Sequence, residues 1–246
     1  MSFQKLNSKF NEIKKLGWIE SQRKGSTGIG QTLEFLLEKK EDRAPLPDYE
    51  DIEIKTKKYG SHSYTTLFSL TPKSKKTEYE INRLVTKFGY PDKTLKEYKV
   101  LNTEIYANQK NLVANRYYFQ LEINRIEKRI YLKVLNWNNT INEKEAYWNF
   151  SELEERLNTK LRKLAVVHAL KKNYMGKEYY KYYRIDFYLL KNFDTFLELL
   201  ESGIIQVKLK VGVIKSGENK GKLHDHGTSF DINELNFEKL FHKINL

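Results

Sequence analysis

Apolar residues recur at helical spacing in several stretches, and these stretches predict helices. The predicted helices cover residues 3–16, Ile29 to about Lys40, a segment that Ser151 opens, and residues 193–200. Ser151 and Glu154 have the spacing of a capping box, which satisfies the free amide groups at a helix start. Gly17 and Gly203 follow two of the stretches and are expected to end those helices.

Other stretches alternate between apolar and polar residues or are short and apolar, and these predict strands. The predicted strands cover residues 51–55, 64–70, 117–123, 129–135, 165–169 and 207–211. We expect Tyr64–Leu70 to be the hairpin partner of the strand that ends at Lys55. A chain of 246 residues is long enough for one large domain or two lobes with a sizeable core.

The strand at residues 51–55 follows Pro47 and Asp48 and is rich in carboxylates. Successive side chains of a strand point to opposite faces, so Asp51, Glu53 and Lys55 are expected to share one face. Hard oxygen ligands of this kind suit Mg²⁺, and a lysine beside them could orient a water or stabilise a phosphorane. The same alternation is also typical of any half-exposed strand, so the pattern alone leaves both interpretations open.

A glycine-rich segment, Lys24–Gln31, precedes the second helix. It lacks the Gly-Lys-Ser/Thr ending of a phosphate-binding loop. We therefore interpret Gly28 and Gly30 as positions where the helix start approaches either another part of the backbone or a DNA phosphate. Glu34 flanks the apolar stripe of this helix and points either toward the carboxylates or into solvent.

The C-terminal part of the chain contains a basic ribbon. Lys208 and Lys210 share one face of an alternating strand, a loop over Lys215–Lys222 follows, and then comes His224-Asp225-His226. A two-stranded ribbon with a basic loop fits a DNA major groove, where polar side chains reach base edges. A solvated hairpin is the alternative. Zinc binding by the two histidines is a third, although five histidines and no cysteine make a complete ligand set hard to assemble.

Composition narrows the function classes. The chain has 44 Lys and Arg against 32 Asp and Glu, a net charge of +12, which favours a polyanionic partner such as nucleic acid or reflects a lysine-rich proteome. The absence of cysteine excludes a disulfide framework and a thiolate metal site. No apolar run approaches the ~20 residues of a membrane span, and residues 1–5 lack the core of a signal peptide, so we expect a cytoplasmic protein without a membrane partner.

Three sequence blocks in this order resemble the MvaI-like type II restriction endonucleases, a group related to the mismatch-repair nicking enzyme MutH. The blocks are Thr27–Glu34, Pro47–Thr56 and Ser216–Thr228. They cover both ends of the chain, which is therefore identified as a whole-chain member of this group. The resemblance implies an α/β fold (α+β, with a mixed central sheet) of the PD-(D/E)xK type, with catalytic and DNA-recognition lobes.

The resemblance also implies roles for individual residues. Asp48, Glu53 and Lys55 match the catalytic triad, and Asp48, Glu53 and the carbonyl of Ile54 match the ligands of Mg²⁺, for which Mn²⁺ can substitute. Lys55 is expected to position the attacking water. Glu34 matches a helix glutamate of the nicking relatives, which orients the lysine or helps to bind a second ion.

Asp51 competes with these carboxylates for a catalytic role and ranks second. The implied lobes cover about residues 1–150 for catalysis and about 151–246 for DNA recognition. The residues expected to contact double-stranded DNA are Lys24, Thr27, Gly28, Lys208, Lys210, Lys215, Lys220, Lys222, His224, Asp225 and His226.

The implied function is Mg²⁺-dependent cleavage of double-stranded DNA at a short, near-palindromic site, leaving 5′-phosphate and 3′-hydroxyl ends. The enzyme is expected to be a monomer within a restriction–modification system, whose methyltransferase is not a bound subunit. The resemblance suggests a CCNGG-like target. Relatives tend to place an acid and an arginine where this chain has Lys208 and Lys210, so the exact site is left open. A MutH-like nicking enzyme and a non-catalytic DNA-binding relative are the alternatives, and the intact triad argues against the second.

Overall fold

The computed structural model describes residues 2–38, 47–61 and 63–246, and these form two compact units. Unit 1 comprises Met1–Ser63, Arg156–Lys191 and Phe237–Leu246, and unit 2 comprises Tyr64–Glu155 and Asn192–Asn236. The chain therefore crosses between the units four times, whereas the expected lobes met at a single boundary after residue 150. The roles assigned to the lobes stay predictions.

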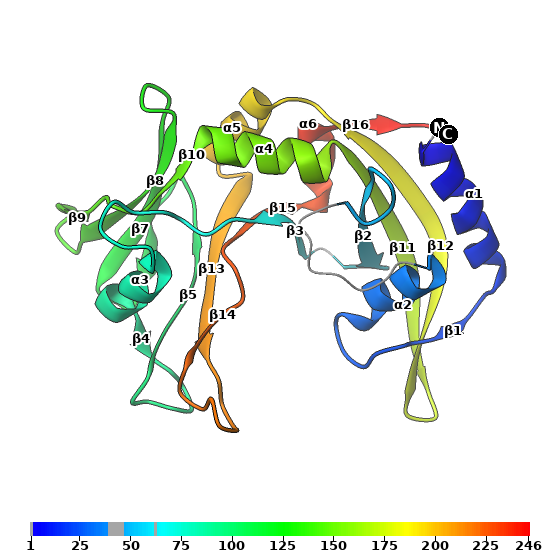
Figure 1. Ribbon diagram of the computed structural model, residues 1–246, viewed down its shortest axis with the longest axis horizontal. Helices are drawn as coiled ribbons and strands as arrows, with labels where there is room; N and C mark the ends of the chain where they lie inside the picture. Colours follow the sequence, from blue (N-terminus) through cyan, green and yellow to red (C-terminus); the bar gives the residue numbers. More distant parts are fainter. Residues whose placement is uncertain (1, 39–46, 62) are drawn as a thin grey trace. The chain divides into compact units, whose positions relative to one another are not determined.

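Unit 1 is built on one sheet, in the order β1-β12-β11-β2 with β16 also paired to β12. Its elements are α1 (Ser2–Lys15), β1 (Ile19–Glu20), α2 (Gly28–Leu36), β2 (Glu53–Lys58), β11 (Lys163–Tyr174), β12 (Lys177–Leu190), α6 (Phe237–Leu240) and β16 (Phe241–Ile244). The β2–β11 pairing is parallel, and β11 and β12 form a long antiparallel hairpin (Figure 1). Helix α4 (Phe150–Leu161) includes the boundary between the units at Glu155 and Arg156.

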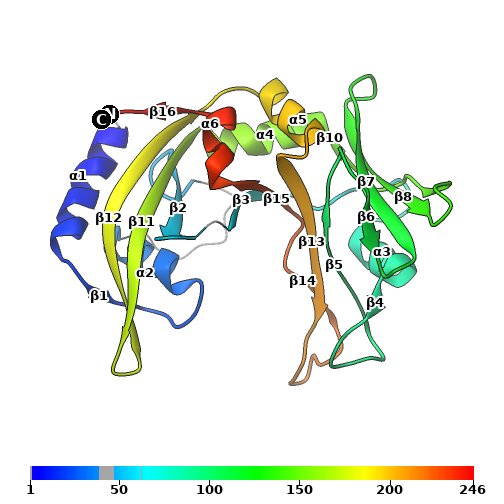
Figure 2. The same ribbon diagram turned by 180° about the vertical axis from the view of Figure 1, so that it is seen from behind.

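Strand alternation gives the unit 1 sheet an apolar face and a polar face. Ile54 of β2, Val167 of β11 and Phe187 of β12 are buried in one core cluster with Leu6 of α1 and Leu33 of α2. Helix α1 packs against β12 and α2 against β2 (Figure 2). This core places the intervening residues of each strand on the opposite side of the sheet.

We call that opposite side the polar face. It carries Glu53, Lys55, His168 and Asp186, together with the other residues of these strands that alternate with the core residues. Glu53 and Lys55 alternate with Ile54 on β2, and His168 and Asp186 alternate with Val167 and Phe187 on β11 and β12.

The structure corrects the expected partner of the carboxylate-rich strand. Strand β3 (Tyr64–Ser69) pairs with β15 in unit 2, and β2 pairs with β11 instead. The predicted short strand at residues 165–169 is the middle of the 12-residue β11. Periodicity cannot show this pairing, because it joins segments more than 100 residues apart.

Unit 2 contains two sheets, in the orders β10-β8-β7-β6 and β3-β15-β13-β5-β4, with β9 paired to β8 and β14 to β13. Besides β3, its elements are α3 (Glu80–Phe88), β4 (Tyr90–Pro91), β5 (Lys99–Ile105), β6 (Asn111–Val113), β7 (Tyr117–Asn124), β8 (Arg129–Asn136), β9 (Ile141–Glu143), β10 (Tyr147–Asn149), α5 (Phe193–Glu201), β13 (Ile205–Val213), β14 (Leu223–Asp225), β15 (Ser229–Asn233) and the 3₁₀ turn Glu234–Asn236. The predicted strands at 117–123 and 129–135 are confirmed as the antiparallel pair β7–β8.

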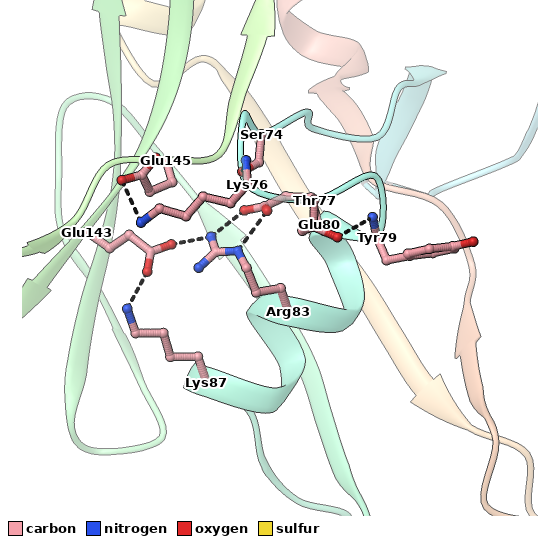
Figure 3. A network of polar contacts seen from close by, with 9 residues as sticks. All are labelled: Ser74, Lys76, Thr77, Tyr79, Glu80, Arg83, Lys87, Glu143 and Glu145. Carbon is pink, nitrogen blue, oxygen red and sulfur yellow. Dashed lines mark hydrogen bonds and ion pairs between the residues drawn. The ribbon is translucent and has the colours of Figure 1, made fainter.

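Helix α3 is tied to β9 by a buried charge network (Figure 3). Arg83 donates from Nε to Glu80 at 2.8 Å and also pairs with Glu143, which accepts from Lys87 as well. Glu80 and Glu143 are only 2% and 6% exposed. Burial raises the pKa of Glu143, but hydrogen bonds from Arg83 and Lys87 outweigh it and hold that pKa below its ordinary value.

The predicted helix boundaries are largely confirmed. Helix α1 ends before Gly17, which has a φ of +71°, and Asn192 caps α5 by accepting a hydrogen bond from the Thr195 amide at 2.8 Å. The capping-box prediction at Ser151 is wrong, because α4 begins at Phe150 and Ser151 lies inside it. The expected end of the second helix at Lys40 lies outside the described residues. In the described part of the chain, no helix is long and apolar enough to cross a membrane.

Candidate functional site

A tight turn brings Asp48 back to strand β2. The backbone groups of Tyr49 and Ile52 exchange hydrogen bonds of 2.8 and 2.9 Å, which close a turn at Glu50, whose φ is +49°. Asp48 Oδ2 then accepts a hydrogen bond from the Ile54 amide at 2.9 Å. This amide lies on the edge strand of the sheet, where a side-chain acceptor replaces the missing neighbouring strand. The carboxylate of Asp48 is therefore fixed beside Glu53 by the backbone of β2.

Glu53 is buried among cations on the polar face. Lys55 Nζ donates to Glu53 Oε1 at 2.6 Å, and Lys160 Nζ at the end of α4 lies 3.5 Å from the same oxygen. Only 1% of the residue surface of Glu53 is exposed, whereas 22% of the Lys55 side chain is. Burial raises the pKa of Glu53 and the charge of Asp48 raises it further, which outweighs the lowering by Lys55 and Lys160. Burial and Asp48 thus favour the neutral form of Glu53, whereas the two lysines favour its carboxylate.

The arrangement fits a small, hard cation. Glu53 Oε2 is buried and has no hydrogen-bond partner among the residues that the structure describes, and a buried oxygen of this kind is costly unless something binds it. Within the described ranges no three His, Cys, Asp or Glu side chains group into a metal site. A cation held by Asp48 and Glu53 would complete its shell with water and phosphate oxygens, as Mg²⁺ commonly does.

The two secondary candidates, Asp51 and Glu34, lie in different elements. Asp51 is exposed in the turn before β2, not on the strand as expected, and forms an ion pair with Lys163. The hydrogen bond from Lys163 lowers the pKa of Asp51. Glu34 is half-buried on α2, where its Oε1 and Thr56 Oγ1 flank Gly30, and its charge acts on Tyr182 of the core. The expected role of Glu34 toward Lys55 stays a prediction.

The glycine-rich segment shows why Gly28 is required. A Cβ at Gly28 would lie 2.3 Å from the Arg23 carbonyl oxygen, so the helix start lies against backbone of its own unit. At Gly30 the nearest atom to a Cβ would be Thr56 Oγ1 at 3.5 Å, an ordinary contact. Lys24 and Thr27 are exposed, and the Thr27 side chain forms no capping hydrogen bond although it precedes the helix.

In unit 2, the predicted sharing of a face by Lys208 and Lys210 agrees with the burial pattern of β13, in which both are half-buried between buried neighbours. Lys208 Nζ donates to Glu104 Oε1 at 2.6 Å, and the hydrogen bond from Lys208 lowers the pKa of Glu104. Lys210 is the register partner of Asn102 on β5. His224 pairs with Gly212 and so lies on the same face, whereas Asp225 pairs with the buried Val211.

The loop after β13 is supported by the hairpin between β4 and β5. Lys215 forms an ion pair with Asp92, and a Cβ at Gly221 would lie 2.3 Å from the ring of Tyr98. The side chains of Lys220 and Lys222 are exposed, and the latter donates to Asn219 at 2.8 Å. These contacts hold the loop against the β4–β5 hairpin on the surface of unit 2.

The expected ribbon is present as the antiparallel pair β13–β14. The rings of His224 and His226 lie edge to face with centroids 4.2 Å apart, and both residues are exposed. The His226 amide donates to the Lys210 carbonyl at 3.0 Å, so the backbone around His226 is held against β13.

Three residues near these groups were missed from the sequence. Lys160 lies near the end of α4, and no local signal in the sequence connects it to Glu53. Asn102 and Glu104 alternate with the buried Leu101 and Ile105 on β5, which is a strand pattern that could have been recognised. Their position beside Lys208 and Lys210 depends on the β5–β13 pairing, which no pattern within β5 reveals.

Comparison with known proteins shows which family the chain belongs to. A model of the MvaI/BcnI restriction endonuclease family matches residues 7–241. The solved complex of restriction endonuclease MvaI with its cognate DNA substrate is 32% identical, with a TM-score of 0.89, over 98% of this chain and 96% of that chain. MvaI in the absence of DNA is 30% identical, with a TM-score of 0.62, over 99% and 96%. No match is found among curated proteins. The chain therefore has the MvaI fold and belongs to the MvaI/BcnI restriction endonuclease family of type II site-specific deoxyribonucleases.

Proposed function

We propose that this endonuclease cuts double-stranded DNA in a Mg²⁺-dependent reaction in which Asp48, Glu53 and Lys55 are the catalytic residues. The observation that carries the proposal is Glu53, a buried carboxylate with one oxygen bound to Lys55 and the other without a described partner. Asp48 and Glu53 would hold the cation, and Mn²⁺ has the same preference for oxygen ligands. The solved complex of the relative MvaI contains its cognate DNA substrate, which supports DNA as the substrate here.

Among the side chains, Lys55 is the group proposed to orient the attacking water. Its ammonium lies on the rim of the site, 22% exposed, and can orient a water for in-line attack on phosphorus. The new bond joins the water oxygen to phosphorus, and the bond to the 3′ oxygen breaks, leaving a 5′-phosphate and a 3′-hydroxyl after proton transfer through solvent. When bound, Mg²⁺ supplies Lewis-acid stabilisation of the developing charge. Lys160 adds a second positive charge, which favours the ionised form of Glu53.

In unit 2, we assign DNA contacts to the face of the β13–β14 pair that carries Lys208 and Lys210 of β13 and His224 of β14. The neighbouring Glu104 and Asn102 add an acceptor and an amide to this face. Lysine suits guanine O6 and N7, carboxylate suits the cytosine amino group, and asparagine suits adenine. Together these side chains offer both donors and acceptors to base edges. Which of them reach the bases determines the target sequence.

The wider proposal is a cytoplasmic restriction–modification system. The endonuclease acts as a monomer, and a methyltransferase of the same system protects the site without being a bound subunit. Sedimentation of the purified protein checks that it is a monomer. Protection of plasmid sites by the methyltransferase checks that the two enzymes belong to one system.

Digestion of a sequenced supercoiled plasmid with the purified protein tests the proposed function. Discrete fragments that require Mg²⁺ and disappear with EDTA are expected, and the sequenced ends give both the site and the end chemistry. Relaxed circles alone would replace the proposal by a nicking enzyme. Absence of cleavage on unmethylated and hemimethylated plasmids would overturn it.

Substitution of the proposed catalytic residues gives the matching prediction. Lys55→Ala and Asp48→Ala are each expected to reduce cleavage by at least about 10³-fold while DNA binding persists, because they remove groups that act on the transition state. Asp51→Asn is the matched control, because its carboxylate is exposed and pairs with Lys163, and wild-type cleavage is expected. Substantial cleavage by either alanine variant would contradict the assignment.

A further inference from the structure

The polar face of the unit 1 sheet extends well beyond the proposed catalytic residues. Lys55 is the register partner of Val166 on β11, and Ala169 marks the helix-covered face of the same strand. Alternation from these positions places Lys172 on the polar face. On β12, Tyr180 and Tyr182 belong to the core cluster, so Tyr179 and Lys181 lie on the polar face too.

Lys172 is held by aromatic rings at the end of this face. Its Nζ lies 4.4 Å from the ring centroid of Trp18 and 5.7 Å from that of Tyr179. A cation over an aromatic face is attracted to it without being neutralised. The Lys172 side chain is exposed and Trp18 is 39% exposed, so the ammonium is both ordered and accessible.

The carboxylates of this region already have partners. Glu20 is bound by Lys177 at 2.9 Å, and Glu178 is bound by Lys171 at 2.5 Å. Within the part of the chain that the structure describes, no ion pair involves Lys172 or Lys181. Two positive charges therefore remain available on the polar face.

A shallow depression of about 440 Å³ lies beside Lys172. It is lined by Lys58, Tyr59, Leu170, Lys171, Lys172 and Asn173. Two of its three lysines, Lys58 and Lys172, are exposed. A depression with this lining suits a phosphate group, which several ammonium groups can approach without specific base contacts.

We propose that Lys172 and Lys181, with Trp18 and Tyr179 holding the former, bind backbone phosphates of the DNA at a distance from the bond that is cut. The proposal rests on the proposed function, because it uses the same substrate on the same face. Lys172 lies six residues beyond Val166, which is about 20 Å along an extended strand. The two lysines therefore contact other phosphates than the one at Lys55, and they position the duplex without reading its sequence.

Binding measurements on Lys172→Ala, Lys181→Ala and the double variant test the proposal. Affinity is measured in EDTA by fluorescence anisotropy over a range of salt, with a duplex containing the mapped site and a scrambled duplex. Each substitution is expected to weaken binding to both duplexes by a similar factor. It should also reduce the slope of log K against log salt by about 0.9 per lost phosphate contact.

Lys14→Ala is the matched control, because Lys14 is an exposed lysine in the last turn of α1, on the opposite side of the sheet. It is expected to keep the wild-type affinity and salt slope. Trp18→Leu should reproduce part of the Lys172→Ala loss and Trp18→Phe should restore it, since a second ring replaces the first.

A double variant with wild-type affinity and salt slope would overturn the proposal while discrete plasmid cleavage by the wild-type protein keeps the proposed function intact. A loss confined to the specific duplex would also overturn it, because a phosphate contact acts on both duplexes. Wild-type protein that binds neither duplex would instead count against the proposed function.

Discussion

At the scale of single residues, strand alternation predicted correctly that Glu53 and Lys55 share a face. The same rule was wrong for Asp51, because the strand begins at Glu53 and Asp51 belongs to the preceding turn. A positive φ at Glu50 sets this boundary, and glutamate carries no signal for such a conformation. The sequence could therefore place Glu53 and Lys55 on the strand, but it could not place Asp51 in the turn.

Asp186 gives a prediction about pH. Burial raises the pKa of Asp186, but hydrogen bonds from His168 and Lys243 outweigh it and hold that pKa at about 2, below the ordinary 3.8. A carboxylate whose pKa is lowered by folding stabilises the folded state at pH values above its ordinary pKa of 3.8. This stabilisation is lost as the pH falls toward 2. Asp186→Asn is expected to lower the free energy of unfolding by about 2 kcal/mol at pH 7 and by less at pH values between about 4 and 2.

Urea unfolding at several pH values measures this difference. Asp194→Asn is a suitable control, since 79% of the Asp194 side chain is exposed, and its effect should stay within about 0.5 kcal/mol. A penalty for Asp186→Asn that does not change between neutral and acid pH would contradict the prediction.

At the scale of elements, helices were easier to predict than the partners of strands. The stripe of α1 and the apolar face of α2 are local patterns, and both helices are present. The start of α2 is set by a steric requirement, because Gly28 contacts the Arg23 carbonyl while Gly30 has room. The sequence indicated that both glycines let the helix start lie close to another group. Only the fold shows that this is true of Gly28 and not of Gly30.

A pair of glycine substitutions tests this distinction. Gly28→Ala is expected to lower the free energy of unfolding by about 1–3 kcal/mol, because its Cβ would collide with backbone. Gly30→Ala is expected to be neutral or to stabilise the protein by up to about 1 kcal/mol through helix propensity. Thermal unfolding of both variants measures the effect, and equal melting temperatures would refute the steric argument.

The network around Arg83 gives a second prediction for elements. Arg83→Met leaves the carboxylates of Glu80 and Glu143 buried with less compensating charge, so unit 2 should lose about 3–5 kcal/mol of stability. Lys76→Met is the control, because the pair of Lys76 with Glu145 is exposed and should contribute under about 1 kcal/mol. Urea unfolding compares the two, and similar midpoints would show that burial does not govern this network.

At the scale of the whole molecule, the expected lobes and the observed units differ in how the chain builds them. The sheet of unit 1 joins β2 to β11 and β12, and a sheet of unit 2 joins β3 and β5 to β13 and β15. A resemblance carried by sequence blocks gave the fold family, but no local pattern indicates which distant strands pair. The division at residue 150 followed chain order, whereas the units follow these pairings.

A fragment experiment checks this interleaving. Residues 1–150 contain β2 and β3 but lack the strands that pair with both. In the isolated fragment, the amides of β2 and β3 are expected to lose the protection from hydrogen exchange that they have in the full chain, whereas the sheet of β6 to β10 keeps all its strands. Protected amides in β2 and β3 of the fragment would mean that these strands find other partners and that the interleaving is dispensable.

The parallel pairing of β2 with β11 also has a consequence for the order of events during synthesis. Glu53 pairs in register with Leu164, so β2 must wait for about 110 further residues before its neighbour exists. At roughly 5–20 residues per second, this delay is about 5–20 s. A nascent chain therefore carries Glu53 without the strand beside it until about two thirds of the protein has been made, and the proposed site is incomplete for all of that time.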